Sequence, residues 1–126
     1  MTTYLWIGLG GFLGANARYL VQTWAVSIWG INFPYGTMIA NVMGTFLLAL
    51  FATVITENFP VNQEIRLFIA TGFLGGYTTF SSFGYETWQL FEVEGILPAT
   101  LNLFGNLGLG ALGLVLGLIV ARWLGA

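Results

Sequence analysis

The chain of 126 residues contains no cysteine, histidine, lysine or aspartate, and only 6% of its residues are charged. Without cysteine there are no disulfide bonds and no thiolate chemistry, and without histidine as well the common transition-metal sites are missing. No nucleophile–base pair of an enzyme is present, and no P-loop motif indicates a nucleotide partner. Three arginines make no basic patch for nucleic acid. The sequence therefore argues against an enzyme and against nucleic-acid or nucleotide binding.

Apolar residues dominate what is there. They make up 57% of the chain, and the mean hydropathy is +0.85. A soluble domain carries about 25% charged residues. This composition predicts an integral membrane protein that lies in the lipid bilayer, and the length is that of a single domain.

Four hydrophobic segments are each long enough to cross a bilayer, which takes about 20 residues. The first has no basic start, so we interpret it as a membrane span and not as a signal peptide. Short connections rich in Pro, Gly and Asn make neighbouring helices antiparallel and place both termini on one side. We therefore expect an all-α fold with one transmembrane domain over residues 1–126, with spans at about 4–26, 35–56, 64–91 and 97–124.

The few arginines give a weak orientation signal. Arg66 and Arg122 are expected on the side of the termini, and Arg18 toward the opposite side. Loop Lys and Arg normally fix orientation by the positive-inside rule. Because the bias is so small, we expect insertion in both orientations. Four short helices also make a thin bundle for a complete pore, so we predict an antiparallel, dual-topology homodimer.

The third segment contains a stretch unlike an ordinary membrane helix. Residues 72–86 hold three glycines within five positions, then hydroxyls and aromatic rings, then Glu86. Gly and Thr form helices poorly, so we predict a break near residues 75–79. A break exposes backbone groups, which is tolerated in a membrane only beside protein or a water-filled cavity. An ion site and a simple packing kink are the two interpretations.

Small residues recur at four-residue spacing on every predicted helix. Such pairs allow helix backbones to approach closely, and tight packing alone explains them. The pairs are Gly10 with Gly14, Ala40 with Gly44, Gly72 with Gly76, and Gly113 with Gly117.

Polar side chains within the predicted spans are mostly hydrogen-bond donors. Apart from the carboxylate of Glu86, the set consists of amides, hydroxyls and one guanidinium, and it includes Arg18, Asn41, Thr78, Thr79, Ser81, Ser82, Asn102 and Asn106. A donor-rich path favours an anion, because donors replace its water shell. The asparagines serve equally well as hydrogen bonds between helices, and Arg18 as an anchor at the membrane surface.

Phe80 and Phe83 are three positions apart and project to one side of the helix after the break. The edge of an aromatic ring is electropositive, so the two rings can hold an anion weakly. Weak binding suits conduction, because the ion must also leave. Ordinary packing of the two rings is the alternative.

Three motifs together resemble those of the Fluc (CrcB-type) fluoride channels of bacteria. They are Gly10-Gly11-x-x-Gly14-Ala15-x-x-Arg18-Tyr19, Asn41-Val42-x-Gly44-Thr45 and Gly72-Phe73-x-Gly75-Gly76-Tyr77-Thr78-Thr79-Phe80-Ser81-Ser82-Phe83. The resemblance covers all four predicted helices. It implies dual-topology homodimers in the cytoplasmic (inner) membrane, with two pores at the dimer interface through which fluoride leaves the cell passively.

The resemblance also implies roles for individual residues. The fluoride pore would be formed by Asn41, Phe80, Ser81, Ser82, Phe83 and Glu86. Arg18 would lie near the aqueous vestibule. The backbone carbonyls of Gly75 and Thr78, from both subunits, would bind a structural Na⁺ ion at the centre of the dimer.

The chain departs from the family pattern at two positions. Ser82 stands where members often have Thr, and Phe104 where they often have Tyr. Ser82 keeps the hydroxyl, whereas Phe104 lacks the hydroxyl that Tyr would add to the row of polar groups along the pore.

Two other functions remain as alternatives, a proton-coupled multidrug exporter and a structural subunit without transport. The exporter class needs a carboxylate deep in the first helix, where this chain has Arg18, and a structural subunit predicts a featureless third helix.

Overall fold

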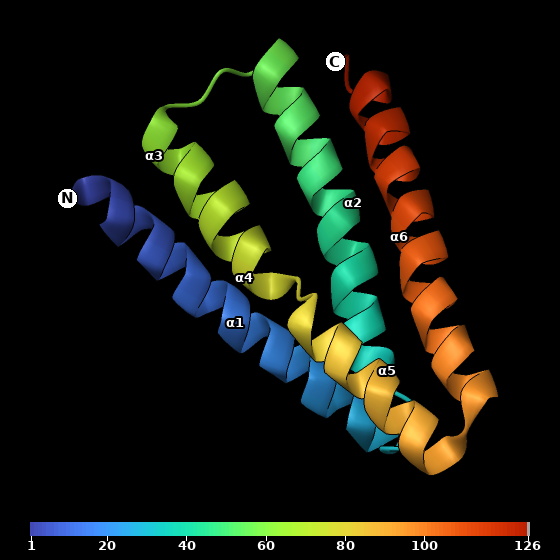
Figure 1. Ribbon diagram of the computed structural model, residues 1–126. Coiled ribbons are helices and arrows are strands. Elements are labelled where there is room, and N and C mark those ends of the chain that lie inside the picture. The colour runs from blue at the N-terminus through green and yellow to red at the C-terminus, as the bar shows by residue number, and fades with distance from the viewer. Residues whose placement is uncertain (126) are drawn as a thin grey trace.

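The computed structural model describes residues 1–125, which are helical except for short connections (Figure 1). No strand occurs over this range. The elements are α1 (Thr2–Trp29), α2 (Tyr35–Glu57), α3 (Gln63–Arg66), the π-helix η1 (Leu67–Leu74), α4 (Gly75–Tyr77), α5 (Ser81–Glu94) and α6 (Ile96–Trp123). Because α3, η1, α4 and α5 follow one another along the third predicted segment, the chain has four helical segments, as predicted.

The four segments run alternately up and down, and both chain ends lie at the same end of the molecule (Figure 1). The segment α1 packs along η1 and α4, and α2 packs along α6. The helix α5 packs against α6 at the other end. The third segment thus begins beside α1 and finishes beside α6, which brings residues from all four segments to its middle.

Two glycines with positive φ end helices at the lower turns. Gly30 (φ 79°) follows α1, and Gly95 (φ 99°) separates α5 from α6. Glycine adopts this backbone conformation without steric cost. The predicted spans left residues 92–96 as a connection, and all of these except Gly95 are instead helical. Gly95 alone turns the chain, so no longer connection is needed.

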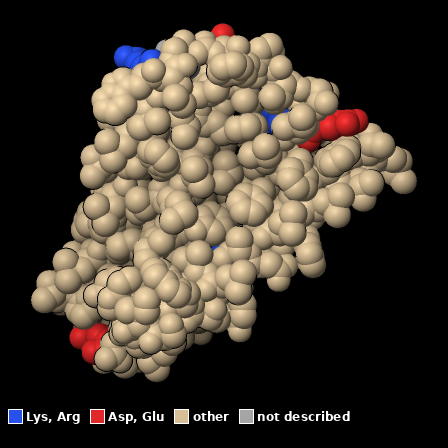
Figure 2. All heavy atoms as spheres, turned by 180° about the vertical axis from the view of Figure 1, so that it is seen from behind, with Lys and Arg blue, Asp and Glu red and all other residues tan. Residues whose placement is uncertain are grey.

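Within residues 1–125, two helices are long and apolar enough to cross a membrane, namely α2 and α6, each with an 18-residue window of mean hydropathy 2.1. Only 22% and 17% of these windows are buried, whereas the core helix of a soluble protein is mostly buried. The face in Figure 2 is almost uncharged between its two ends. For α1 and the interrupted third segment, crossing of the membrane stays a prediction.

Glycines allow the backbones of neighbouring segments to touch. A Cβ on Gly72 would lie 2.7 Å from the carbonyl oxygen of Ile7, and one on Gly76 would lie 2.9 Å from that of Gly11. Likewise, a Cβ on Gly113 would lie 2.9 Å from the carbonyl oxygen of Val42. These contacts confirm that the small residues mark close packing between helices.

The third segment is interrupted where the sequence predicted a break. The helix α4 ends at Tyr77, Thr78 is extended (φ −84°, ψ 157°), and α5 begins at Ser81. The π-helix before it was not predicted. Its last turn runs into α4 through a hydrogen bond from the Gly75 N–H to the Ala70 carbonyl, five residues back. The regular helical hydrogen bonding is thus interrupted at residues 78–80.

Candidate functional site: the interruption of the third helix

The side chain of Asn41, on α2, holds the backbone at the interruption. Its Oδ1 accepts a hydrogen bond from the Thr79 N–H (2.8 Å), and its Nδ2 donates to the Thr79 carbonyl (3.0 Å). The same Nδ2 donates to Oδ1 of Asn106 on α6 (3.1 Å). One amide therefore satisfies both backbone polar groups of Thr79, which the helix no longer pairs.

A second side chain caps the helix that follows. The Thr79 hydroxyl accepts a hydrogen bond from the Ser82 N–H (3.1 Å) and lies 3.4 Å from the Ser81 hydroxyl. In a continuous helix, the Thr79 and Ser82 N–H groups would pair with the carbonyls of Gly75 and Thr78. Both N–H groups are instead taken by side chains. Within residues 1–125, the carbonyls of Gly75 and Thr78 accept no hydrogen bond.

Arg18, on α1, bridges the two sides of the interruption. Its Nε donates to the Gly76 carbonyl (3.2 Å), and its Nη1 donates to the Ser82 hydroxyl (3.4 Å). Gly76 belongs to α4 and Ser82 to α5. The guanidinium is thus directed toward the third segment and joins its two halves.

The two phenylalanines differ sharply in exposure. Phe80 is 80% exposed, and Phe83 is only 5% exposed. Their ring centroids lie 5.7 Å apart at 68°, an edge-to-face arrangement. They line an open pocket of about 280 Å³ together with Asn41, Thr45, Thr78, Thr79, Asn106 and Leu107. This pocket combines ring edges with amide and hydroxyl groups.

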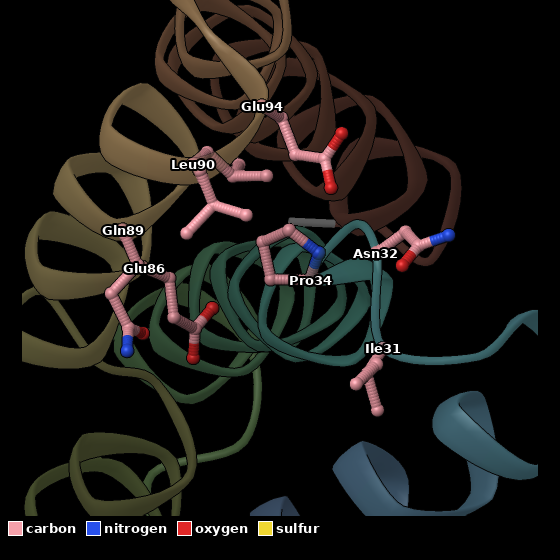
Figure 3. A pocket seen from close by; sticks show the side chains of 8 residues that line it. Ile31, Asn32, Pro34, Glu86, Gln89, Leu90 and Glu94 are labelled. Atoms are coloured by element: carbon pink, nitrogen blue, oxygen red, sulfur yellow. The ribbon is translucent and has the colours of Figure 1, made fainter.

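Glu86 lies one turn further along α5, in a different environment. Its Oε1 accepts a hydrogen bond from the Thr37 hydroxyl (2.8 Å), to which Gln22 also donates (3.0 Å). Its other oxygen is buried and has no partner within the described chain. Two open pockets of about 300 and 340 Å³ reach Glu86, and the first is shown in Figure 3, where Glu86 and Glu94 lie on either side of Pro34.

The predicted site residues thus fall into two groups within one chain. The pocket beside the phenylalanine rings is lined by Asn41, Thr78, Phe80 and Phe83. A separate pocket is lined by Ser82 and Glu86. The remaining three lie at the interruption itself. Arg18 donates hydrogen bonds to both of its sides, and the Gly75 carbonyl accepts none within residues 1–125. Ser81 is exposed and lies beside Thr79.

Sequence reasoning missed Gln22 and Thr37, which adjoin Glu86. A usable signal exists, because residues four positions apart share a helix face. Gln22 follows Arg18 by four residues, and Thr37 precedes Asn41 by four. Over the described range, no cluster of three or more His, Cys, Asp or Glu side chains could bind a metal ion. The carbonyls of Gly75 and Thr78 as ligands of a cation stay a prediction.

Comparison with known proteins gives a consistent family. Residues 5–118 match the family model described as CrcB-like protein, Camphor Resistance (CrcB). Proteins named "Fluoride-specific ion channel FluC" match along nearly their whole length. One from Roseiflexus sp. is 42% identical over 92% of this chain and 94% of its own. One from Acidobacterium capsulatum is 45% identical over 94% and 95%, and one from Chloroflexus aurantiacus is 38% identical over 99% of both chains. The chain therefore belongs to the CrcB-like family, a family of ion channels and not of enzymes.

Proposed function

We propose that this protein is a passive, fluoride-selective channel, and that two copies of the chain form two pores at their interface. One observation carries the proposal. The relatives named as fluoride-specific channels are about 40% identical to this chain and align with more than nine-tenths of it. The aligned range includes the interruption and both phenylalanines. The site chemistry supports an anion independently.

The pocket at Phe80 and Phe83 suits a small anion held weakly. Ring edges carry partial positive charge, and no formal charge lines this pocket. Amide and hydroxyl groups of Asn41, Thr78 and Thr79 lie on the same pocket. Because the ion meets partial charges only, it can enter and still leave, as conduction requires.

A second copy would complete the pore. Phe80 is 80% exposed although it is adjacent to the most polar part of the fold. The pocket beside it is open to the outside, and α2 and α6 expose most of their apolar surface. We propose that an antiparallel second subunit covers the interruption, with dual topology in the cytoplasmic membrane.

The interruption also supports a structural Na⁺ ion. The carbonyls of Gly75 and Thr78 accept no hydrogen bond within residues 1–125, and carbonyl oxygen is a ligand that suits a hard cation. One chain supplies two such oxygens, so the ion would need two more from the partner. Bound there, Na⁺ would neutralise the carbonyl dipoles and hold the subunits together.

The remaining polar residues would form the track on either side of the phenylalanines. We propose that Ser81, Ser82 and Glu86 line the ion path and that Arg18 lies at the vestibule, where its charge attracts anions. Both N–H groups of Asn41 are already donated to Thr79 and Asn106. Asn41 would therefore shape the pore wall by holding Thr79, and not by donating to the ion.

A cell-based experiment tests the function. The chain is expressed in a bacterial strain that has no fluoride exporter of its own, and cell fluoride is measured after an external load. The proposal predicts low cell fluoride and growth with the natural sequence, and fluoride accumulation with the matched variant Phe80→Ile. Equal accumulation in cells with the natural sequence and in cells with empty vector would contradict it.

A further inference from the structure

A row of buried polar side chains links α6 to the interruption of the third segment. Asn106 and Asn102 are 7% and 1% exposed. Nδ2 of Asn41 donates to Oδ1 of Asn106 (3.1 Å), and Nδ2 of Asn106 donates to Oδ1 of Asn102 (3.1 Å). Nδ2 of Asn102 then donates to the Thr87 hydroxyl (2.8 Å), which donates to the Phe83 carbonyl (2.7 Å).

The direction of every bond in this row follows from its first member. The Thr79 N–H can only donate, so Oδ1 of Asn41 must face it, and Nδ2 of Asn41 is turned toward Asn106. Each amide then presents its oxygen to the preceding residue and its nitrogen to the next. At the end of the row, the Thr87 hydroxyl accepts from Asn102 and donates its own proton to the Phe83 carbonyl.

The row therefore begins and ends on the same short piece of backbone. Its first contact is the peptide group of Thr79, just before Phe80, and its last is the carbonyl of Phe83. Between these points it passes through α2 and α6. The backbone from Thr79 to Phe83, which carries both phenylalanines, is thus tied at both ends by a row of hydrogen bonds that runs through α2 and α6.

We propose that Asn102, Asn106 and Thr87 are positioning residues of the pore, acting through Asn41 and the Phe83 carbonyl on the two phenylalanine rings. The inference rests on the proposed channel function. Hydrogen bonds that serve only to hold helices together could form between any two facing polar side chains, without being connected to one another. Here three side chains act in series, and each takes its orientation from the one before it. Thr87 does not line the pocket, so breaking the row there releases the ring geometry without removing a pocket-lining group, whereas Asn106 lines the pocket itself.

Thr87 offers the cleanest test, because Thr87→Val removes the hydroxyl and keeps the shape. The matched control is Thr53→Val. The Thr53 hydroxyl also donates to the carbonyl four residues back at 2.7 Å, and it has no further partner. Fluoride and chloride release from liposomes is measured for both variants. We expect Thr87→Val to lower fluoride release about tenfold and to raise the share of chloride. A tenfold change in rate corresponds to the free energy of about one buried hydrogen bond.

Three results of this experiment decide the proposal. Thr87→Ser keeps the hydroxyl and should restore both the rate and the selectivity. Thr53→Val should behave as the natural sequence does. A purely structural role of Thr87 would lower the yield of folded protein and leave the fluoride-to-chloride ratio of the surviving molecules unchanged, and that outcome would overturn the inference.

A double variant tests whether the residues act in series. Asn106→Ala and Thr87→Val break the row at two places that do not touch. If the row acts as one unit, the double variant should release fluoride no more slowly than the slower single variant. Independent effects would instead multiply, because changes at separate sites add in free energy. Multiplied losses would overturn the inference.

Failure of the inference and failure of the proposed function look different. If the natural sequence releases no fluoride, the proposed function fails, and the inference fails with it. If the natural sequence releases fluoride selectively and Thr87→Val does so equally, only the positioning role is lost.

Discussion

At the scale of single residues, Asn41 determines how the backbone passes through the interruption. Its amide replaces the helical partners of the Thr79 peptide group. An unpaired buried backbone group costs about 1–3 kcal/mol, so one side chain offsets the loss of two. If the third segment crosses the bilayer as predicted, such replacement would allow the break at membrane depth.

Asn41→Asp should abolish fluoride release while Asn62→Asp leaves it unchanged. A carboxylate only accepts hydrogen bonds, so it cannot donate to the Thr79 carbonyl or to Asn106, and it places negative charge beside an anion path. Asn62 caps α3 by accepting from the Ile65 N–H, and Asp caps equally well. Efflux from liposomes measures both. Normal efflux from the Asn41→Asp variant would remove Asn41 from the site.

Phe80→Ile should reduce fluoride efflux by at least about tenfold, if a ring edge supplies about 1.4 kcal/mol of stabilisation to the passing ion. Since Phe80 is 80% exposed in one chain, its loss should cost the subunit fold little. Size-exclusion chromatography should show an intact dimer. Unaltered efflux from a dimeric variant would show that the ring edge has no role.

From the sequence alone, the types of residue at the site could be predicted, but the contacts between them could not. Asn41, Phe80 and Phe83 stand out in the sequence as amide and aromatic groups beside a break. The links from Asn41 to Thr79 and from Arg18 to Gly76 join residues that are 38 and 58 positions apart. Such contacts depend on how the segments pack, which no local pattern encodes. The roles of these residues in conduction stay predictions.

At the scale of elements, the interrupted third segment depends on close contact with α1. The glycines at 72 and 76 allow η1 and α4 to lie against the backbone carbonyls of Ile7 and Gly11 in α1. The break was predictable from its glycines and threonines, because they weaken a helix locally. The π-helix was not, since apolar residues at positions 67–74 fit an α-helix equally well.

Gly76→Ala should destabilise the protein, whereas Gly108→Ala should not. A Cβ at position 76 would lie 2.9 Å from the Gly11 carbonyl oxygen, so a backbone must move. At Gly108 nothing lies within 4 Å. Overpacking typically costs about 1–3 kcal/mol. Loss of the dimer on heating, followed by size-exclusion chromatography, compares the two. Equal stability of the two variants would argue against the contact.

At the scale of the whole molecule, the proposed dimer would need the surface that one chain presents from two copies. The pocket at Phe80 is open, and α2 and α6 expose their apolar sides. The all-α fold and the number of helical segments were predictable, because they follow from the hydropathy pattern of the sequence. The number of subunits and their orientation depend on surfaces that one chain leaves unpaired, so they stay proposals.

Dual topology can be measured with a single introduced cysteine, because the chain has none of its own. Ile31 lies between α1 and α2 and is 83% exposed. If the chain inserts both ways, a membrane-impermeant maleimide should label about half of the Ile31→Cys molecules in intact cells, as expected from a very weak charge bias. Labelling of all molecules or of none would establish a single orientation.

Removal of Na⁺ should weaken the dimer. If the carbonyls of Gly75 and Thr78 from two subunits bind one ion, a bulky organic cation cannot replace it. Purification in N-methylglucamine salts should then shift the protein toward monomers on size-exclusion chromatography, and added Na⁺ should reverse the shift. A dimer that is equally stable in both salts would refute the ion site and leave the channel proposal intact.

Fluoride efflux from liposomes is the most direct test of the channel itself. Purified protein is reconstituted, and fluoride and chloride release are followed in parallel with ion-selective electrodes, without any energy source. A passive fluoride channel predicts rapid fluoride release that needs no ATP or proton gradient, with little chloride release. Equal release of both ions, or no release from protein shown to be dimeric, would contradict the account.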